Sequence, residues 1–487
     1  MNYPPAPLPR LFPCSGRHAS HDLLTRREML RKSAGGLGGI ALSWLLAQSG
    51  LARASAPCPA LNLLPKPPHF APRARNVIFL YMGGGPSHMD LLDPKPLLAK
   101  YDGQPIPFRV EQRDLHSAAK VMASPFKFAK YGHSGLDVSE LLPHLATVAD
   151  ELAVVRSGVT TRVDHGEALL MMHTGRPISG FPTMGSWITY GLGTENANLP
   201  AYVAMPDGPS ERVRNATSAG WLPALYQGTP MNTGEGDPFF FLNPPGDSSV
   251  VDRHPAEFLR LTQALNRRHR AARPEVSQLD ARIQNFELAA RMQVESMKQV
   301  DIAAESPATR KLYGLDDKKT EPFGRRCLIA RRLVEAGVRF VHIMRNDWDH
   351  HSGLKFGLTR VCAETDQPVA GLLKDLKGRG LLDETLVVWT GEFGRLPVVE
   401  GSDGRDHNPH GFTFWMAGGG VKAGTIYGAT DEFGYRAAEN PVRVADLHAT
   451  LFHLLGLQHD KLVFEFEGRE ETITGVESAR VVKELIS

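Results

Sequence analysis

Short apolar segments, each bounded by turn residues, recur along most of the chain. They are continuously apolar and rich in β-branched residues, which is typical of strands buried on both faces of a mostly parallel sheet. Helical patterns lie between them. The predicted strands are 77–82, 152–156, 201–205, 338–344, 386–390 and 412–417, and the predicted helices are 138–150, 325–335, 369–379 and 444–455. This alternation of strands and helices predicts an α/β fold.

The segment 255–304 departs from the alternation. It contains long charged, Gln-rich stretches that carry Leu and Met and are interrupted only by Pro274. We expect it to form a helical hairpin inserted into an α/β domain that runs from 76 to 487. That length exceeds the commonest domain size, and the pattern leaves open one large core with insertions or two domains.

The first 54 residues follow a different pattern. Arg26-Arg27 precede a weakly apolar stretch, 33–51, which four glycines interrupt and which ends in Ala52-Arg53-Ala54. This arrangement resembles a twin-arginine signal peptide, and a membrane anchor is the alternative. We therefore expect the twin-arginine machinery to export the protein to the periplasm or cell envelope. Residues 55–75, rich in Pro and Ala, are expected to form an extended lead-in.

Charge and cysteine usage narrow the function classes. The 487 residues carry 55 Lys and Arg against 53 Asp and Glu, so the formal net charge is +2. Proteins that track nucleic-acid phosphates are generally much more basic, which argues against a nucleic-acid partner. The four cysteines form no CxxC pair, so neither a zinc finger nor a disulfide framework is expected.

Polar residues directly follow several predicted strands. In open α/β sheets, the residues after the carboxyl ends of neighbouring strands converge on one crevice. Three segments supply candidates for metal binding: His88 and Asp90 follow the first strand, Asp347 and His351 follow the fourth, and Glu392, His407 and His410 follow the fifth. Carboxylates and imidazoles crowded in this way are typical of metal sites, although each segment alone could be a polar turn or a helix cap.

A fourth polar segment, residues 160–167, precedes an apolar helix and is suited to holding an anion at the start of that helix. It contains Thr161 and His165. Arginines near the strand ends could clamp the oxygens of an anion in pairs, since a guanidinium offers parallel donors. The candidates are Arg176, Arg345 and Arg395.

Taken together, the motifs resemble the alkaline phosphatase and sulfatase superfamily. The chain is most similar to a largely uncharacterised, twin-arginine-exported bacterial family labelled domain of unknown function 1501. The similarity rests on the GGPSHMD loop and the DPKP that follows it, TGEFGR at 390–395 and GRDH at 404–407. It covers essentially the whole chain after the leader. It implies a three-layer sandwich around a mostly parallel sheet.

The resemblance also suggests roles for individual residues. Asp347 and His351 match an Asp-x-x-x-His that supplies one metal, with His407 or His410 as its later histidine. Glu392 stands where the superfamily usually has a metal-binding Asp, and the next residue is Phe rather than His. His165 falls at the position of the nucleophile. The Cys-x-Pro/Ala-x-Arg motif of formylglycine sulfatases is absent. The nearest candidate runs from Cys327 to Arg331, and Ile329 occupies its third position.

These observations predict an exported metal-dependent hydrolase of phosphate or sulfate esters, acting on an anionic ester such as a sulfated or phosphorylated glycan. One or two divalent ions (zinc, calcium, magnesium or manganese) are expected. Glu392, His88, Asp90 and His165 are candidates for a second metal or for acid–base work, and Arg395 for holding the ester. A metal-activated water is the simplest attacking group, with Thr160, Thr161 and Ser87 as covalent alternatives.

Two other classes are compatible with the sequence. A degenerate member of the superfamily could bind metal, a glycan or a protein partner without turnover, because fold does not fix function. A purely structural envelope protein would fit the leader but would leave the concentration of His, Asp and Glu after strands unexplained. The substrate, the metal and the oligomeric state are not indicated by the sequence.

Overall fold

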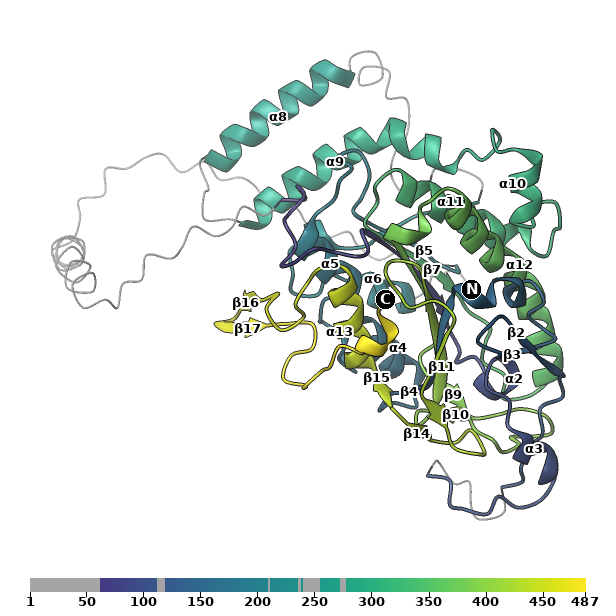
Figure 1. Cartoon of the computed structure of the whole chain (residues 1–487). Helices are drawn as coiled ribbons and strands as arrows, with labels where there is room; N and C mark the ends of the chain where they lie inside the picture. Colours follow the sequence, from purple (N-terminus) through teal and green to yellow (C-terminus); the bar gives the residue numbers. More distant parts are fainter. Residues whose placement is uncertain (1–61, 112–118, 209–210, 235–237, 240–254, 272–276) are drawn as a thin grey trace, which may run out of the picture. The chain divides into compact units, whose positions relative to one another are not determined.

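A computed structural model describes residues 62–111, 119–208, 211–234, 238–239, 255–271 and 277–487 (Figure 1). The predicted signal peptide, 1–54, and the start of the predicted lead-in lie outside these residues. From 62 to 75 the chain contains no helix or strand. Among the residues described, no helix is long and apolar enough to cross a membrane.

A mostly parallel sheet forms the centre of the fold, as predicted. In the described part of the chain it has nine strands in the order β12-β4-β11-β8-β1-β7-β5-β6, with β15 also paired to β4. Only β11 runs antiparallel to its neighbours in this sheet. The strands are β1 (Asn76–Met82), β4 (Leu152–Val159), β5 (Tyr202–Met205), β6 (Thr229–Pro230), β7 (Phe340–Arg345), β8 (Thr385–Thr390), β11 (Phe412–Ala417), β12 (Thr425–Tyr427) and β15 (Val442–Arg443). All six predicted strands are therefore confirmed.

Helices cover both faces of this sheet, which makes three layers (Figure 1). The alternation of β1 shows the two faces: Ile78 and Leu80 enter one hydrophobic core, and Val77 and Phe79 enter the other. The first core is closed by α11 (Glu321–Glu335), α12 (Leu354–Gly378) and the 3₁₀ helix Leu145–Glu151, and the second by α4 (His165–Thr174), α5 (Met184–Leu192) and α13 (Val444–Leu454).

Three of the four predicted helices are present, and the prediction of a helix over 138–150 is wrong in its first half. Residues 325–335 and 444–454 are helical, and 369–378 form the end of α12. Where a helix was expected from 138, the chain instead pairs β2 (Phe128–Tyr131) with β3 (Leu136–Ser139). Pro143 separates β3 from the 3₁₀ helix because its ring removes a backbone donor and disfavours a helical residue before it.

The inserted segment contains two helices, α8 (Pro255–Ala271) and α9 (Ser277–Val300), which contact each other. The turn expected between them falls in 272–276, outside the described residues. Leu288 and Met292 attach α9 to the first core. The remaining elements are α2 (His88–Leu91), α3 (Pro96–Lys100), α6 (Glu211–Thr217), α10 (Pro307–Leu312), β9 (Gly394–Arg395), β10 (His407–Asn408), β13 (Ala429–Thr430), β14 (Ala437–Glu439), β16 (Phe464–Phe466), β17 (Arg469–Glu471) and three further 3₁₀ turns, Ala224–Tyr226, Leu382–Glu384 and Lys483–Leu485.

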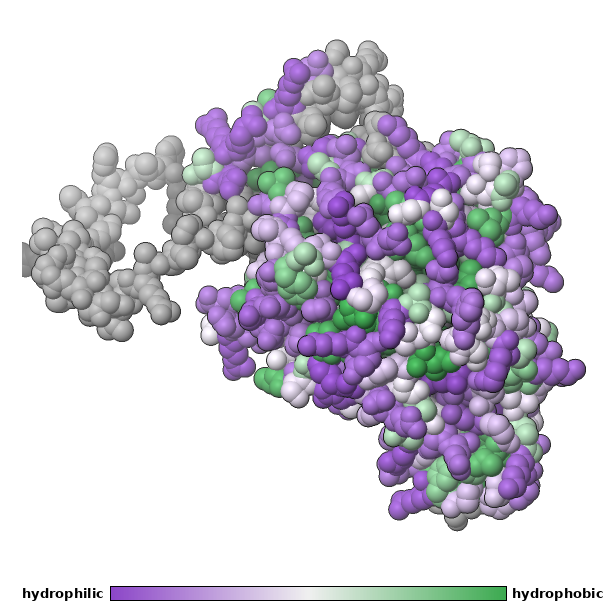
Figure 2. Space-filling view, in the orientation of Figure 1, coloured by the Kyte–Doolittle hydropathy of each residue, from purple (hydrophilic) through white to green (hydrophobic). Residues whose placement is uncertain are grey.

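The face shown in Figure 2 is mainly hydrophilic, with hydrophobic residues scattered between charged ones. This pattern is ordinary for a folded domain, because apolar atoms make up much of any protein surface.

Candidate metal centre

Three neighbouring parallel strands deliver polar segments to one edge of the sheet. β8, β1 and β7 lie side by side, and their carboxyl ends lead into 391–395, 83–85 and 346–351. The start of α4 and the short strand β10 approach the same edge, since His407 in β10 and His165 in α4 both contact residues of these loops. The sheet therefore brings together segments that are far apart in sequence.

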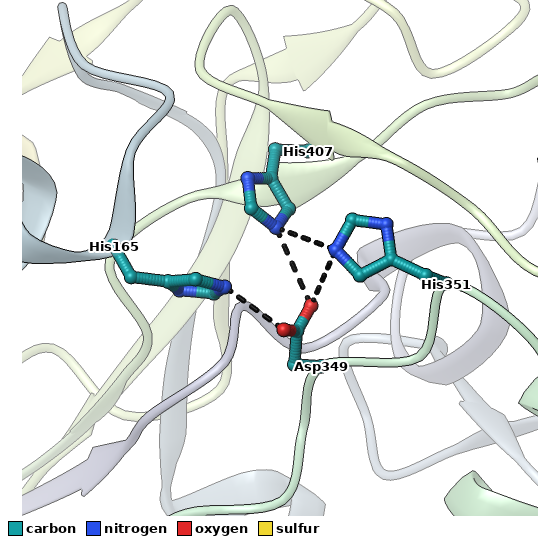
Figure 3. A group of neighbouring side chains, drawn as sticks. All are labelled: His165, Asp349, His351 and His407. Atoms are coloured by element: carbon teal, nitrogen blue, oxygen red, sulfur yellow. Dashed lines mark hydrogen bonds and ion pairs between the residues drawn. The ribbon is translucent and has the colours of Figure 1, made fainter.

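Four side chains meet there: His165, Asp349, His351 and His407 (Figure 3). Asp349 Oδ1 lies 2.9 Å from His351 Nε2 and 3.3 Å from His407 Nε2. Its second oxygen, Oδ2, lies 3.0 Å from His165 Nε2. The Nε2 atoms of His351 and His407 are 3.0 Å apart. One carboxylate is thus surrounded by three imidazoles that all present the same ring nitrogen.

The other ring nitrogen of each histidine is held by an acceptor. His407 Nδ1 is 2.6 Å from the Val163 carbonyl oxygen, and His351 Nδ1 is 2.5 Å from Glu400 Oε2. A carbonyl or carboxylate can only accept, so these partners assign the N–H to Nδ1. The Nε2 lone pairs of His351 and His407 then face each other across 3.0 Å and face a carboxylate oxygen as well. That arrangement is repulsive unless a metal ion or a proton lies between the atoms.

The Nδ1 atom of His165 is likewise held by an acceptor, here a buried carboxylate. This atom lies 2.7 Å from Glu392 Oε1, and Glu392 is only 2% exposed. Metal-binding histidines usually donate their other N–H to a carboxylate or carbonyl, which fixes the tautomer and the ring orientation. All three histidines of the cluster therefore have the supporting contacts that such ligands need.

Electrostatics keep Asp349 ionised. Burial opposes its charge, but the contacts with the His165 and His407 imidazoles and with the Arg395 guanidinium hold the pKa of Asp349 well below its usual range. Burial likewise opposes charge on His165, yet its contacts with Asp349 and Glu392 raise the pKa of His165 to about 9. Without a metal, a proton on His165 would offset part of the negative charge.

The donor set fits a small divalent cation. Zinc binds imidazole nitrogen and carboxylate oxygen at about 2.0–2.2 Å, so tetrahedral ligands lie about 3.4 Å apart. The spacings from Asp349 to His351 and His407, and between those two histidines, range from 2.9 to 3.3 Å. Three nitrogens and one oxygen favour zinc or another transition metal over calcium or magnesium, which prefer oxygen ligands.

A second group of possible ligands lies behind His351. Glu400 and Asp406 approach His351 Nδ1 at 2.5 and 3.9 Å. Both face the ring nitrogen opposite the cluster, so they are placed to orient His351 rather than to join the four residues.

Glu392 lies beside the cluster and is not part of it. Its Oε1 accepts hydrogen bonds from His165 Nδ1–H and, at 2.8 Å, from the backbone N–H of Gly84. Burial raises its pKa, but the hydrogen bond from His165, the charge of that ring and the Gly84 N–H together leave the pKa of Glu392 below its ordinary value. Glu392 thus supports His165 from behind.

Arg395 directs its guanidinium at groups of the chain itself. It is 1% exposed, and it donates to the carbonyl oxygens of Gly85 at 2.9 Å and Arg405 at 2.8 Å. Its Nη2 bonds Asp349 Oδ1 at 2.6 Å and also the Gly84 carbonyl. Arg395 therefore holds Asp349 and the glycine loop in place.

The structure keeps His88 and Asp90 away from the cluster. Asp90 forms a fully buried ion pair with Arg405, at 2.8 and 3.3 Å, and also accepts from the Ser87 hydroxyl at 2.5 Å. His88 Nε2 lies 2.8 Å from the Gly434 carbonyl, and burial lowers the pKa of His88. This segment supplies a structural contact between the first loop and the GRDH segment.

Asp347 and His410 also lie outside the four residues. Asp347 has a φ of 71°, and its carboxylate pairs with Arg345 at 3.4 Å and Arg360 at 3.5 Å. His410 packs edge-on against Tyr435, with ring centroids 5.4 Å apart. Of the two histidines considered for the later ligand, the structure brings only His407 into the cluster.

The remaining threonine and arginine candidates do not belong to the four-residue cluster. Thr161 is exposed, whereas the Thr160 hydroxyl is buried without a partner among the described residues. Arg176 follows α4 at the end opposite His165 and donates to the Thr474 carbonyl. Arg345 pairs with acidic side chains, including Asp207 at 2.7 Å.

The residue that sequence reasoning missed is Asp349. The signal was its two-residue spacing from His351 in a segment without helix, because alternate residues of an extended chain share a side. The four-residue spacing of Asp347 and His351 would be productive only on a helix.

The fold and site define an α/β protein with a candidate metal centre at the carboxyl edge of its sheet. The chain belongs to the family described as "Protein of unknown function (DUF1501)", whose model matches residues 74–486. A search of the curated proteins finds no match.

Several solved structures are similar to this chain at low identity. The phosphonate monoester hydrolase SpPMH from Silicibacter pomeroyi has 11% identity and a TM-score of 0.35, covering 84% of this chain and 76% of that one. Ps i-CgsB in complex with k-i-k-neocarrahexaose has 10% identity and a TM-score of 0.35, covering 79% and 72%. The lipoteichoic acid synthase LtaP from Listeria monocytogenes has 12% identity and a TM-score of 0.31, covering 80% and 74%.

Proposed function

We propose that this protein is an exported, metal-dependent hydrolase of phosphate or sulfate esters, with its metal held by His165, Asp349, His351 and His407. The observation that carries the proposal is the convergence of three Nε2 atoms on one ionised carboxylate, with two lone pairs only 3.0 Å apart. Export and a sulfated or phosphorylated glycan as substrate follow from the sequence resemblance.

The partners of the three histidines fix which ring nitrogen faces the metal position. Glu400 and the Val163 carbonyl hold the N–H of His351 and His407 away from the centre, and Glu392 does the same for His165. When bound, a divalent ion would polarise an ester oxygen and lower the pKa of a bound water.

The test compares variants of two residues that would bind the metal with variants of two nearby residues of the same type that would not. Asp349→Asn and His407→Ala remove cluster residues, whereas Asp347→Asn and His410→Ala change residues that lie outside it. We expect the wild-type chain and the second pair to retain metal in elemental analysis, and the first pair to lose it. Turnover of p-nitrophenyl phosphate and p-nitrophenyl sulfate should follow the metal.

Two outcomes would change the assignment. Metal retained in Asp349→Asn and His407→Ala would place the site elsewhere. Metal lost from that pair, with no ester turned over by the wild-type protein, would favour the alternative of a binding protein without catalysis.

A further inference from the structure

Helix α8 exposes two leucines to solvent. Leu261 and Leu265, one helical turn apart, are 60% and 57% exposed. Thr262 and Asn266, each one residue further along, are half-buried instead. A helix that only packed against its own protein would bury its apolar stripe and expose its polar one. In α8 these two leucines are exposed, while Thr262 and Asn266 are partly covered.

The exposed side of α8 is also basic. Arg260, Arg267 and Arg268 are all exposed. Arg268 follows Leu261 by seven residues and so continues the leucine stripe, while Arg260 and Arg267 share a neighbouring side. Over its whole length the helix carries four arginines and one acidic residue, Glu257. Leucines flanked by cations are thus presented together.

We propose that this side of α8 docks on an anionic lipid surface. Helices with an apolar stripe beside Lys or Arg lie in the membrane interface, where the leucines enter the acyl boundary and the cations meet anionic headgroups. A second copy of this chain suits the surface less well, because a symmetric contact would place arginines against arginines. The inference is independent of the metal centre.

Vesicle co-sedimentation of the full chain tests this inference. Vesicles of phosphatidylcholine alone are compared with vesicles that also contain phosphatidylglycerol, at low and high salt. One variant carries Leu261→Ser with Leu265→Ser, and another carries Arg260→Gln, Arg267→Gln and Arg268→Gln. Ile178→Ser is the matched control, because Ile178 is 59% exposed and lies elsewhere. Residues 1–61 are identical in all of them.

We expect the wild-type chain and Ile178→Ser to favour the anionic vesicles, and more weakly at high salt. The triple arginine variant should lose roughly a hundredfold in partitioning, since each cation near the surface contributes about fivefold. The leucine variant should bind both vesicles less. Equal binding of wild-type protein to both vesicles, or full binding by either α8 variant, would overturn the proposal. The proposal would also be overturned if light scattering showed that the wild-type protein is a dimer and the leucine variant a monomer.

Discussion

The ion pair between Asp90 and Arg405 should be among the most costly contacts to break. Both side chains are 0% exposed and form two N–H···O contacts, at 2.8 and 3.3 Å. Removing one partner leaves a buried charge without compensation. We therefore expect Asp90→Ala to lower the free energy of unfolding by about 3–5 kcal/mol. Loss of the hydrogen bond from Ser87 adds about 1 kcal/mol.

Replacing both partners should restore much of this loss. In Asp90→Leu with Arg405→Met no charge remains, and apolar side chains of similar volume often replace a buried ion pair at little cost. The double variant should therefore be more stable than the sum of the single changes predicts, by about 2 kcal/mol or more. Arg405 also donates to the Leu396 and Met122 carbonyls, and those acceptors would lose their donor in every Arg405 variant.

Urea unfolding in the presence of a chelator measures these free energies without a contribution from bound metal. The control is Glu384→Ala, which removes an exposed ion pair with Arg75 and should change the free energy by less than about 1 kcal/mol. Metal content of Asp90→Ala, measured separately, should equal that of the wild-type protein. An unchanged unfolding free energy combined with lost metal would refute the reasoning and return Asp90 to the metal ligands.

Three further substitutions test the site and the core. Burial lowers the pKa of His448 to about 4, so the unfolded state binds a proton at this residue before the folded state does. The free energy of unfolding should therefore fall by about 3 kcal/mol between pH 6.5 and pH 4 on account of His448. In His448→Gln, the decrease measured by urea unfolding over this pH range should be smaller by that amount. Gly84→Ala should lower the unfolding free energy by about 1–3 kcal/mol and reduce metal content, because φ is +120° and a Cβ would lie 2.5 Å from the Asp349 nitrogen. Glu400→Gln should weaken metal binding in a competition titration by about 10–100-fold, because His351 loses its charged partner.

The order of the fold was largely readable from the sequence, since strands buried on both faces leave unmistakable apolar runs such as 77–82 and 386–390. The local error at 138–150 has a different cause. Val138 is buried in a short strand, and Leu145 is buried in a 3₁₀ turn, so both are apolar without belonging to one helix. Apolar periodicity does not distinguish these cases over so few residues.

The candidate site was predictable to the level of segments but not of side chains. The loops that follow β1, β7 and β8 do meet, as strand order requires. Which carboxylate points inward depends on backbone conformation, and Asp347 adopts a left-handed φ that turns it toward arginines. Asp90 was ambiguous for another reason: its partner, Arg405, lies 315 residues away, and no local pattern indicates such a pairing.

The glycine loop shows how these segments depend on one another. The Gly84 N–H holds Glu392, its carbonyl accepts from Arg395, and Arg395 in turn holds Asp349. A Cβ at Gly85 would lie 2.6 Å from the Phe393 ring, so the loop needs glycine there to approach the next strand end. Because one network joins the three strand ends, substitutions at Gly84, Arg395 and Glu392 should be non-additive in their effect on metal affinity.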